Sequence, residues 1–176
     1  MSSPDAITPP APAGKTVIVV MGVAGSGKTT VAVQLADRLG WTFAEADDFH
    51  PPANVHKMRA GIALDDADRA PWLARLNAVI RHGIATGAPL VLACSALKAR
   101  YRERLRERAA DVAFVHLAGD FDTIRARLAA RGGHYMPAAL LQSQFDALEP
   151  PVEALAVDVR EPVEAIVARV RGAWGL

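Results

Sequence analysis

Hydrophobic residues along this chain occur in short unbroken runs that alternate with longer amphipathic stretches. The first run, residues 16–21, is almost entirely β-branched, which is typical of a strand buried on both faces of a parallel sheet. The next segment, Lys28–Leu39, places its apolar side chains on one face of a helix, and Gly40 follows it as a stop signal. The pattern therefore predicts a strand followed directly by a helix.

The same alternation continues to the C-terminus. Further strands are expected at Trp41–Glu45, Pro89–Ala93, Val112–Leu117 and Ala154–Val159. Helices are expected within Leu64–Thr86 and at Leu97–Ala109, Phe121–Arg131, Pro137–Leu148 and Pro162–Trp174. Strands that alternate with helices favour right-handed crossover units and a parallel sheet covered on both faces. The predicted fold class is α/β: a three-layer α/β/α sandwich around a five-stranded parallel sheet.

The chain's length of 176 residues fits one domain. Residues 1–14 hold four prolines, no basic residue and no apolar core, so we expect a disordered N-terminal tail there. Residues 15–176 are then a single domain with enough apolar residues, 51% of the chain, for one core. The N-terminus lacks the features of a secretory signal, and the longest apolar runs are too short to span a bilayer. A cytoplasmic protein without a membrane partner is expected.

Charge and cysteine content exclude several further classes of function. Lys and Arg together number 20 and Asp and Glu 19, so the net charge of +1 does not support binding to nucleic acid. The single cysteine, Cys94, cannot form an internal disulfide and is interpreted as a buried thiol in a reducing compartment. Function must therefore come from a local site and not from the overall charge of the protein.

One segment carries a specific phosphate-binding signal. Residues 22–29 match G-x-x-x-x-G-K-[ST] at every fixed position and lie between a buried strand and an amphipathic helix. Backbone N–H groups of such a loop surround phosphate oxygens, while Lys28 would reach the β- and γ-phosphates and Thr29 would bind Mg²⁺. The predicted ATP-binding residues are Gly22, Val23, Ala24, Gly25, Ser26, Gly27, Lys28, Thr29 and Thr30.

The phosphate loop alone leaves three classes of protein open. They are a kinase of small molecules or nucleotides, a GTPase switch, and a regulatory module that binds a nucleotide without turning it over. A GTPase would need an Asn-Lys-x-Asp segment after a strand, and the chain has none. The remaining residues must therefore distinguish a kinase from a regulatory module.

A polar segment, residues 45–59, follows the second predicted strand and holds acids, histidines, a lysine and an arginine. We expect this strand to lie beside the strand that precedes the phosphate loop, so that its end faces the γ-phosphate. Carboxylates there can hold Mg²⁺ or accept a proton from an incoming hydroxyl. The cluster suits an anionic acceptor that carries hydroxyl groups.

Several segments of the chain resemble those of the gluconate kinases. The segments that carry the resemblance are His50–Asn54, Lys57-Met58 with Gly61, Asp66–Leu73, Cys94–Lys98 with Tyr101-Arg102, Gly133–Pro137, and Leu141–Phe145 with Leu148–Pro150. They occur in unbroken order from about Val17 to Val159. One departure is Ala46, which replaces the usual glycine between two acids.

The resemblance implies transfer of the ATP γ-phosphate to the 6-hydroxyl of D-gluconate, which gives 6-phospho-D-gluconate. It also implies a fold like those of shikimate and nucleoside monophosphate kinases, a mobile lid near residues 125–140, and a homodimer. A kinase of this fold for another small hydroxy acid, of the shikimate type, is the alternative, and a regulatory module that does not catalyse is a further one. The paired lid arginines favour catalysis.

Individual roles follow from these positions. Asp47 is expected to be the general base, and Glu45 a Mg²⁺ partner together with Thr29. Arg127 and Arg131 lie four residues apart on one helix face, where they would bind the ATP phosphates and neutralise the transferring group. The remaining predicted acceptor-binding residues are His50, Lys57, Arg59, Ser95, Lys98 and His134. The arginines between 100 and 108 are interpreted as a mostly solvated helix face.

Overall fold

The fold is described from a computed structural model, which covers residue 14 and residues 16–106, 111–132 and 137–176. Most of the predicted tail, the last residues of the helix predicted to end at Ala109, His134, and the middle of the predicted lid lie outside the described residues. All strands and most helices fall within one or two residues of their predicted ends.

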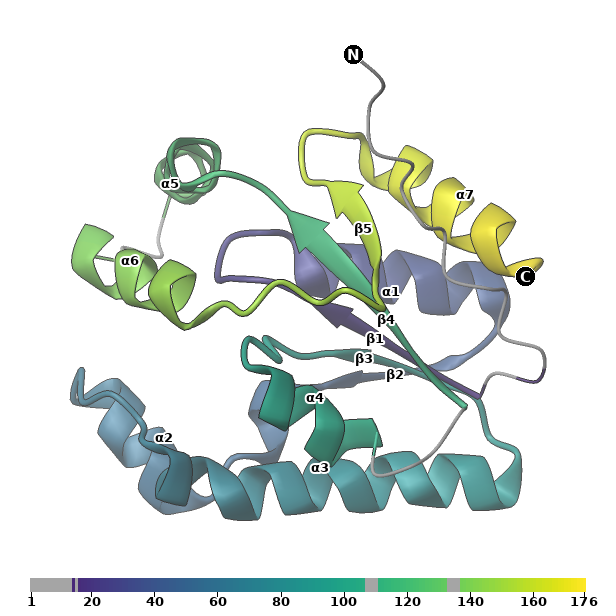
Figure 1. Ribbon diagram of the computed structural model, residues 1–176, viewed down its shortest axis with the longest axis horizontal. Helices are drawn as coiled ribbons and strands as arrows, with labels where there is room; N and C mark the ends of the chain where they lie inside the picture. Colours follow the sequence, from purple (N-terminus) through teal and green to yellow (C-terminus); the bar gives the residue numbers. More distant parts are fainter. Residues whose placement is uncertain (1–13, 15, 107–110, 133–136) are drawn as a thin grey trace.

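A five-stranded parallel sheet in the order β2-β3-β1-β4-β5 forms the centre of the molecule (Figure 1). The strands are β1 (Val17–Met21), β2 (Thr42–Glu45), β3 (Leu90–Ala93), β4 (Val112–Ala118) and β5 (Leu155–Asp158). The predicted number and direction of the strands are confirmed. The expectation that the second strand lies beside the first is wrong, because β3 lies between them and β2 is an edge strand.

Helices cover both faces of the sheet, which confirms the three-layer architecture. In Figure 1, α1 and α7 cover one face and α3 and α4 the other, while α2, α5 and α6 lie beyond the carboxyl ends of the strands. The helices are α1 (Lys28–Leu39), α2 (Pro52–Arg59), α3 (Asp66–Thr86), α4 (Ala99–Arg106), α5 (Phe121–Ala130), α6 (Ala138–Ala147) and α7 (Val163–Trp174). The polar segment after β2, for which no structure was predicted, forms a short 3-10 helix, η1 (Ala46–Phe49), and α2.

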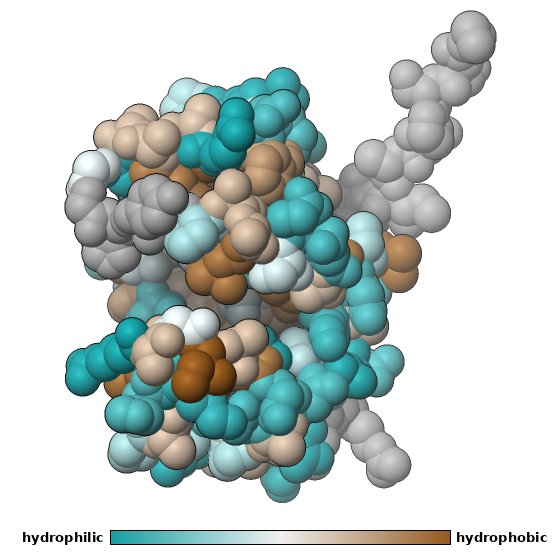
Figure 2. All heavy atoms as spheres, turned by 90° about the vertical axis from the view of Figure 1, so that its left-hand side faces the viewer, coloured by the Kyte–Doolittle hydropathy of each residue, from teal (hydrophilic) through white to brown (hydrophobic). Residues whose placement is uncertain are grey.

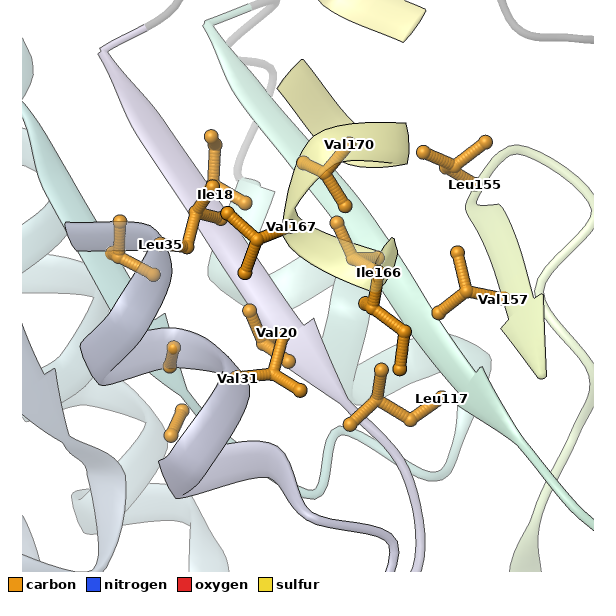
Figure 3. Packing of buried hydrophobic residues seen from close by; sticks show 14 of the residues in the cluster. Ile18, Val20, Val31, Leu35, Leu117, Leu155, Val157, Ile166, Val167 and Val170 are labelled. Carbon is orange, nitrogen blue, oxygen red and sulfur yellow. The ribbon is translucent and has the colours of Figure 1, made fainter. Parts of the chain in front are cut away.

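The core consists of one apolar cluster on each side of the sheet, and all five residues of β1 are buried. Figure 3 shows one of these clusters, in which side chains of α1 and α7 interdigitate with those of β1, β4 and β5. Burial on both faces explains why β1 reads as an unbroken apolar run. Among the described residues, no helix combines the length and the apolar character that a membrane span requires.

Arg102 in α4 corrects the prediction that the arginines of this segment are solvated. Its side chain is buried, and its guanidinium donates to the carbonyl oxygens of Ala96 at 2.9 Å, Leu97 at 3.0 Å and Glu149 at 2.9 Å. These bonds tie the loop that follows β3 to the segment that follows α6. A charge pattern along a helix does not reveal such partners, because they are brought together by tertiary packing.

Candidate active site

The phosphate loop between β1 and α1 has the close packing that its glycines permit. Gly22 has φ 152°, and a Cβ there would lie 2.8 Å from the Ser26 hydroxyl oxygen and 3.0 Å from the Leu117 carbonyl oxygen. Gly25 has φ 78°, and a Cβ there would lie 2.5 Å from the Leu128 side chain on α5. Both positions therefore exclude a side chain by backbone conformation and by space.

The interior of this loop has groups that fit a phosphate ligand. The Ser26 hydroxyl is buried and has no hydrogen-bond partner within the described part of the chain. The Lys28 ammonium lies under the loop and donates to the Val23 carbonyl at 3.1 Å. Burial lowers the pKa of Lys28, and the Asp47 carboxylate opposes that shift. A buried cation and an orphaned donor suit the oxygens of a polyphosphate.

The two residues predicted to hold Mg²⁺ are in direct contact. The Thr29 hydroxyl donates to the Glu45 carboxylate at 2.7 Å. Burial raises the pKa of Glu45, and the hydrogen bond from Thr29 opposes the shift. In the described residues, no group of three or more His, Cys, Asp or Glu side chains could by itself hold a metal. Hard oxygen donors in this small number fit Mg²⁺, which commonly takes one or two protein ligands and completes its shell with phosphate and water.

Asp47 lies beside this pair, in η1. Its side chain is 80% exposed and its carboxylate is 3.9 Å from the Nε2 atom of His50. The His50 ring stacks on Trp72 with centroids 4.5 Å apart, and the Trp72 indole donates to the Ala46 carbonyl at 2.7 Å. Trp72 therefore fixes both His50 and the backbone that carries Asp47.

The other predicted acceptor-binding residues differ in their partners and in their exposure. Lys57 is ion-paired with Asp68, whose two carboxylate oxygens are 2.7 and 2.8 Å from its ammonium. Arg59 is exposed at the end of α2. The Ser95 carbonyl accepts from the Gly22 N–H at 3.4 Å, which places the loop after β3 beside the phosphate loop. Lys98 follows on that loop, 3.8 Å from Asp66.

The paired arginines, Arg127 on α5 and Arg131 directly after it, lie close to the phosphate loop and the first turn of α1. Arg127 donates to the Val159 carbonyl, and its other terminal nitrogen lies 3.5 Å from the position of a Cβ on Gly27. Arg131 lies 3.5 Å from the Thr30 hydroxyl. Figure 2 shows this face of the molecule hollowed between an upper part, over α5 and α6, and a lower part over α2. The structure therefore brings the phosphate loop, Asp47 and both arginines to one side of the sheet.

Gln144 is a site residue that the sequence prediction did not include, although it belongs to a segment that carried the resemblance. Its side-chain oxygen accepts a hydrogen bond of 2.7 Å from the Ala24 N–H of the phosphate loop. Cys94, by contrast, is a buried thiol whose pKa is raised by burial to about 12, which confirms its interpretation as an inert core residue.

Comparisons with known proteins identify relatives of this chain. A family model described as an AAA domain matches residues 17–151. The gluconokinase of Gluconobacter oxydans (strain 621H) is 54% identical over 134 residues, which cover 76% of this chain and 75% of that protein. A probable gluconokinase of Xenopus tropicalis is 44% identical in an alignment of 174 residues. That alignment covers 89% of this chain and 92% of the relative.

Structural similarity leads to the same family. The crystal structure of a gluconokinase from Sinorhizobium meliloti 1021 matches with a TM-score of 0.82 and 44% sequence identity, and covers 90% of this chain and 91% of that chain. The chain therefore belongs to the gluconokinase family of P-loop proteins.

Proposed function

We propose that this chain is a gluconokinase that transfers the γ-phosphate of ATP to the 6-hydroxyl of D-gluconate, giving 6-phospho-D-gluconate and ADP. The observation that carries the proposal is the high identity to gluconokinases over most of the chain. The site supports it, because a phosphate loop, a pair of Mg²⁺-binding candidates and an exposed carboxylate lie at the same edge of the sheet. A nucleotide sensor would not need the carboxylate.

Asp47 acts in this mechanism as the general base. Its carboxylate accepts the proton of the acceptor hydroxyl while that oxygen forms a bond to the γ-phosphorus. The bond between the γ-phosphorus and the oxygen that bridges to the β-phosphate breaks, and ADP leaves with that electron pair. The proton passes to water after product release. A positioned base of this kind contributes a factor of roughly 10² to 10⁴ to the rate.

Cations from two elements neutralise the transferring group. Lys28 donates to the Val23 carbonyl of the phosphate loop, and Arg127 on α5 and Arg131 directly after it lie close to the loop and to Thr30. Magnesium held by Thr29 and Glu45 supplies further positive charge at the phosphate oxygens when it is bound. Binding and charge neutralisation by positioned groups are the main contributions that a protein makes to phosphoryl transfer.

Three further properties belong to this proposal. Residues 125–140 form a lid that closes over ATP and excludes water, supported by the contact between Leu128 and the phosphate loop and by Gly132 with its φ of 51°. Residues 15–176 form one domain. The protein works in the cytoplasm as a homodimer, as the family resemblance implies, and light scattering on the purified chain tests the dimer.

The decisive experiment measures ADP formation with MgATP, alone and with D-gluconate, its stereoisomers or shikimate. Turnover that depends on D-gluconate, with a phosphorylated product at the 6-hydroxyl, is the expected result. Stimulation by another acceptor would show that the substrate is not D-gluconate. Ala46→Gly would then be the first variant to test, because Ala46 is where the chain departs from the family pattern. Tight ATP binding without stimulation by any acceptor would favour the regulatory alternative.

A further inference from the structure

Three cations surround the ring of Tyr101 in α4. The charged groups of Arg69, Lys98 and Arg100 lie 5.7, 5.7 and 5.6 Å from the ring centroid. Asp66 accepts hydrogen bonds from the Tyr101 hydroxyl and from Arg100, while the Lys98 ammonium is 3.8 Å from it, beyond hydrogen-bonding distance. One carboxylate therefore engages Arg100 directly and leaves Lys98 and Arg69 with donors to spare.

Arg69 is the cation of this cluster that has no carboxylate partner. Its guanidinium donates to the Leu64 carbonyl, and within the described ranges it forms no ion pair. The side chain is half-buried, so its charge is not fully solvated. A guanidinium offers five N–H donors in a planar arrangement that matches a carboxylate, so a single backbone acceptor leaves most of its binding capacity unused.

Arg69 faces the acceptor side of the site. It precedes Trp72 by three residues on α3, which places both side chains on one helix face. Trp72 stacks on His50, and the positive charge of Arg69 adds to burial in lowering the His50 pKa. On its other side His50 lies 3.9 Å from Asp47. The His50 imidazole is therefore influenced both by the carboxylate of the proposed base and by the charge of Arg69.

Lys98 reaches the same cluster from a different element. It follows Ser95 by three residues on the loop after β3, and the Ser95 carbonyl contacts the phosphate loop at Gly22. Arg69 on α3 and Lys98 on this loop thus converge on Tyr101, next to the region where phosphate is transferred. Both cations therefore lie on elements that also form the candidate site, since α3 carries Trp72 beside His50 and the loop after β3 contacts the phosphate loop.

We propose that Arg69, assisted by Lys98, binds the carboxylate of the acceptor and makes the site selective for a sugar acid over an uncharged analogue. This inference rests on the proposed function and identifies the group that holds the opposite end of D-gluconate from the hydroxyl that is phosphorylated. An open-chain sugar acid has a hydroxyl end, which the proposed base Asp47 would engage, and an anionic end, which an unpaired guanidinium can bind. Lys57, predicted from the sequence, is instead ion-paired with Asp68.

The test compares D-gluconate with D-gluconamide, in which a neutral amide replaces the carboxylate. Measured values of kcat/KM for both acceptors, in wild-type protein and in Arg69→Gln, give the preference for the charged acceptor. We expect Arg69→Gln to lower kcat/KM for D-gluconate on the order of a hundredfold, mainly through KM, because a close charge pair is lost. The value for D-gluconamide should change less than about threefold, so the preference collapses.

Two further variants make the result interpretable. Lys98→Gln should reduce the same preference by a smaller factor, and Arg104→Gln, an exposed arginine on α4, should leave it at the wild-type value. Equal losses for both acceptors in Arg69→Gln would show a structural role and overturn the inference. So would a preference that collapses only in Lys57→Met or Arg59→Gln.

Failure of the proposed function is a separate outcome. Wild-type protein that binds ATP but forms no ADP with D-gluconate would overturn that function, and this inference with it. If wild-type protein phosphorylates D-gluconate but Arg69→Gln keeps the same preference for D-gluconate over D-gluconamide, only the carboxylate site is overturned. Circular dichroism spectra and MgATP affinities that match wild type confirm that each variant is folded.

Discussion

The Thr29 hydroxyl and the Glu45 carboxylate form a 2.7 Å hydrogen bond between the first turn of α1 and the last residue of β2. Because β3 separates β1 from β2, this contact spans the width of a strand at the carboxyl edge of the sheet. It brings two hard oxygen donors together next to the phosphate loop. The edge strand therefore contributes to the nucleotide site without pairing with the strand that carries the loop.

Replacing Glu45 by Gln should weaken Mg²⁺ binding and leave the fold intact. The amide keeps the size of the side chain but removes the charge, so we expect the Mg²⁺ concentration for half-maximal activity to rise about 10- to 100-fold. Titration of activity with Mg²⁺ at fixed ATP measures this value. The control is Glu103→Gln, an exposed acid on α4. A Mg²⁺ requirement like that of wild type would remove Glu45 from the metal site.

Replacing Asp47 by Asn should lower kcat with D-gluconate at least about a hundredfold, because the amide cannot accept the proton of the acceptor hydroxyl. The neighbouring Asp48→Asn is a matched control, since Asp48 is also exposed in η1. We expect it to keep kcat within about threefold of wild type. Steady-state kinetics at saturating MgATP measures both. Near-normal turnover of Asp47→Asn would exclude the role of base.

Arg127→Ala should reduce kcat by more than it reduces ATP affinity, with a loss in kcat of at least about a hundredfold. Arginines that neutralise a transferring phosphoryl group contribute roughly 10³ to 10⁵ to the rate. Arg125→Ala on the same helix is the control, because Arg125 is exposed and lies 3.9 Å from Asp122. Should Arg127→Ala lose ATP affinity and retain kcat, Arg127 would be a ground-state binder only.

Arg102→Ala should destabilise the fold by about 3 kcal/mol, since it leaves the carbonyl oxygens of Ala96, Leu97 and Glu149 without a charged donor in a buried site. Urea unfolding followed by circular dichroism measures the free energy of unfolding. Arg104→Ala, two residues away and exposed, should change it by less than about 0.5 kcal/mol. Equal stabilities of the two variants would contradict the role of Arg102 as a link between two loops.

Local patterns were sufficient to predict all five strands, most of the helices and the phosphate loop, whereas η1 and α2 were not predicted. The predicted range Lys28–Leu39 coincides with α1, because Gly27 and Gly40 both adopt the left-handed conformation at its ends, with φ 95° and 67°. The unbroken apolar run of β1 predicted a strand with helices on both sides, and the structure has that arrangement. These features depend on residues that are neighbours in the sequence, so their signals are visible there.

Only tertiary structure decided the order of the strands and the partners of the polar side chains. Hydrophobic periodicity does not encode which strands pair, so the edge position of β2 could not be predicted. Gln144 contacts Ala24 across 120 residues of sequence, and Arg69 and Lys98 meet at Tyr101 from separate elements. The partner of a polar side chain depends on which distant segment the tertiary fold brings next to it. The sequence by itself determined the strands, most of the helices, the phosphate loop and the family, and packing decided which charges remain free to bind a substrate.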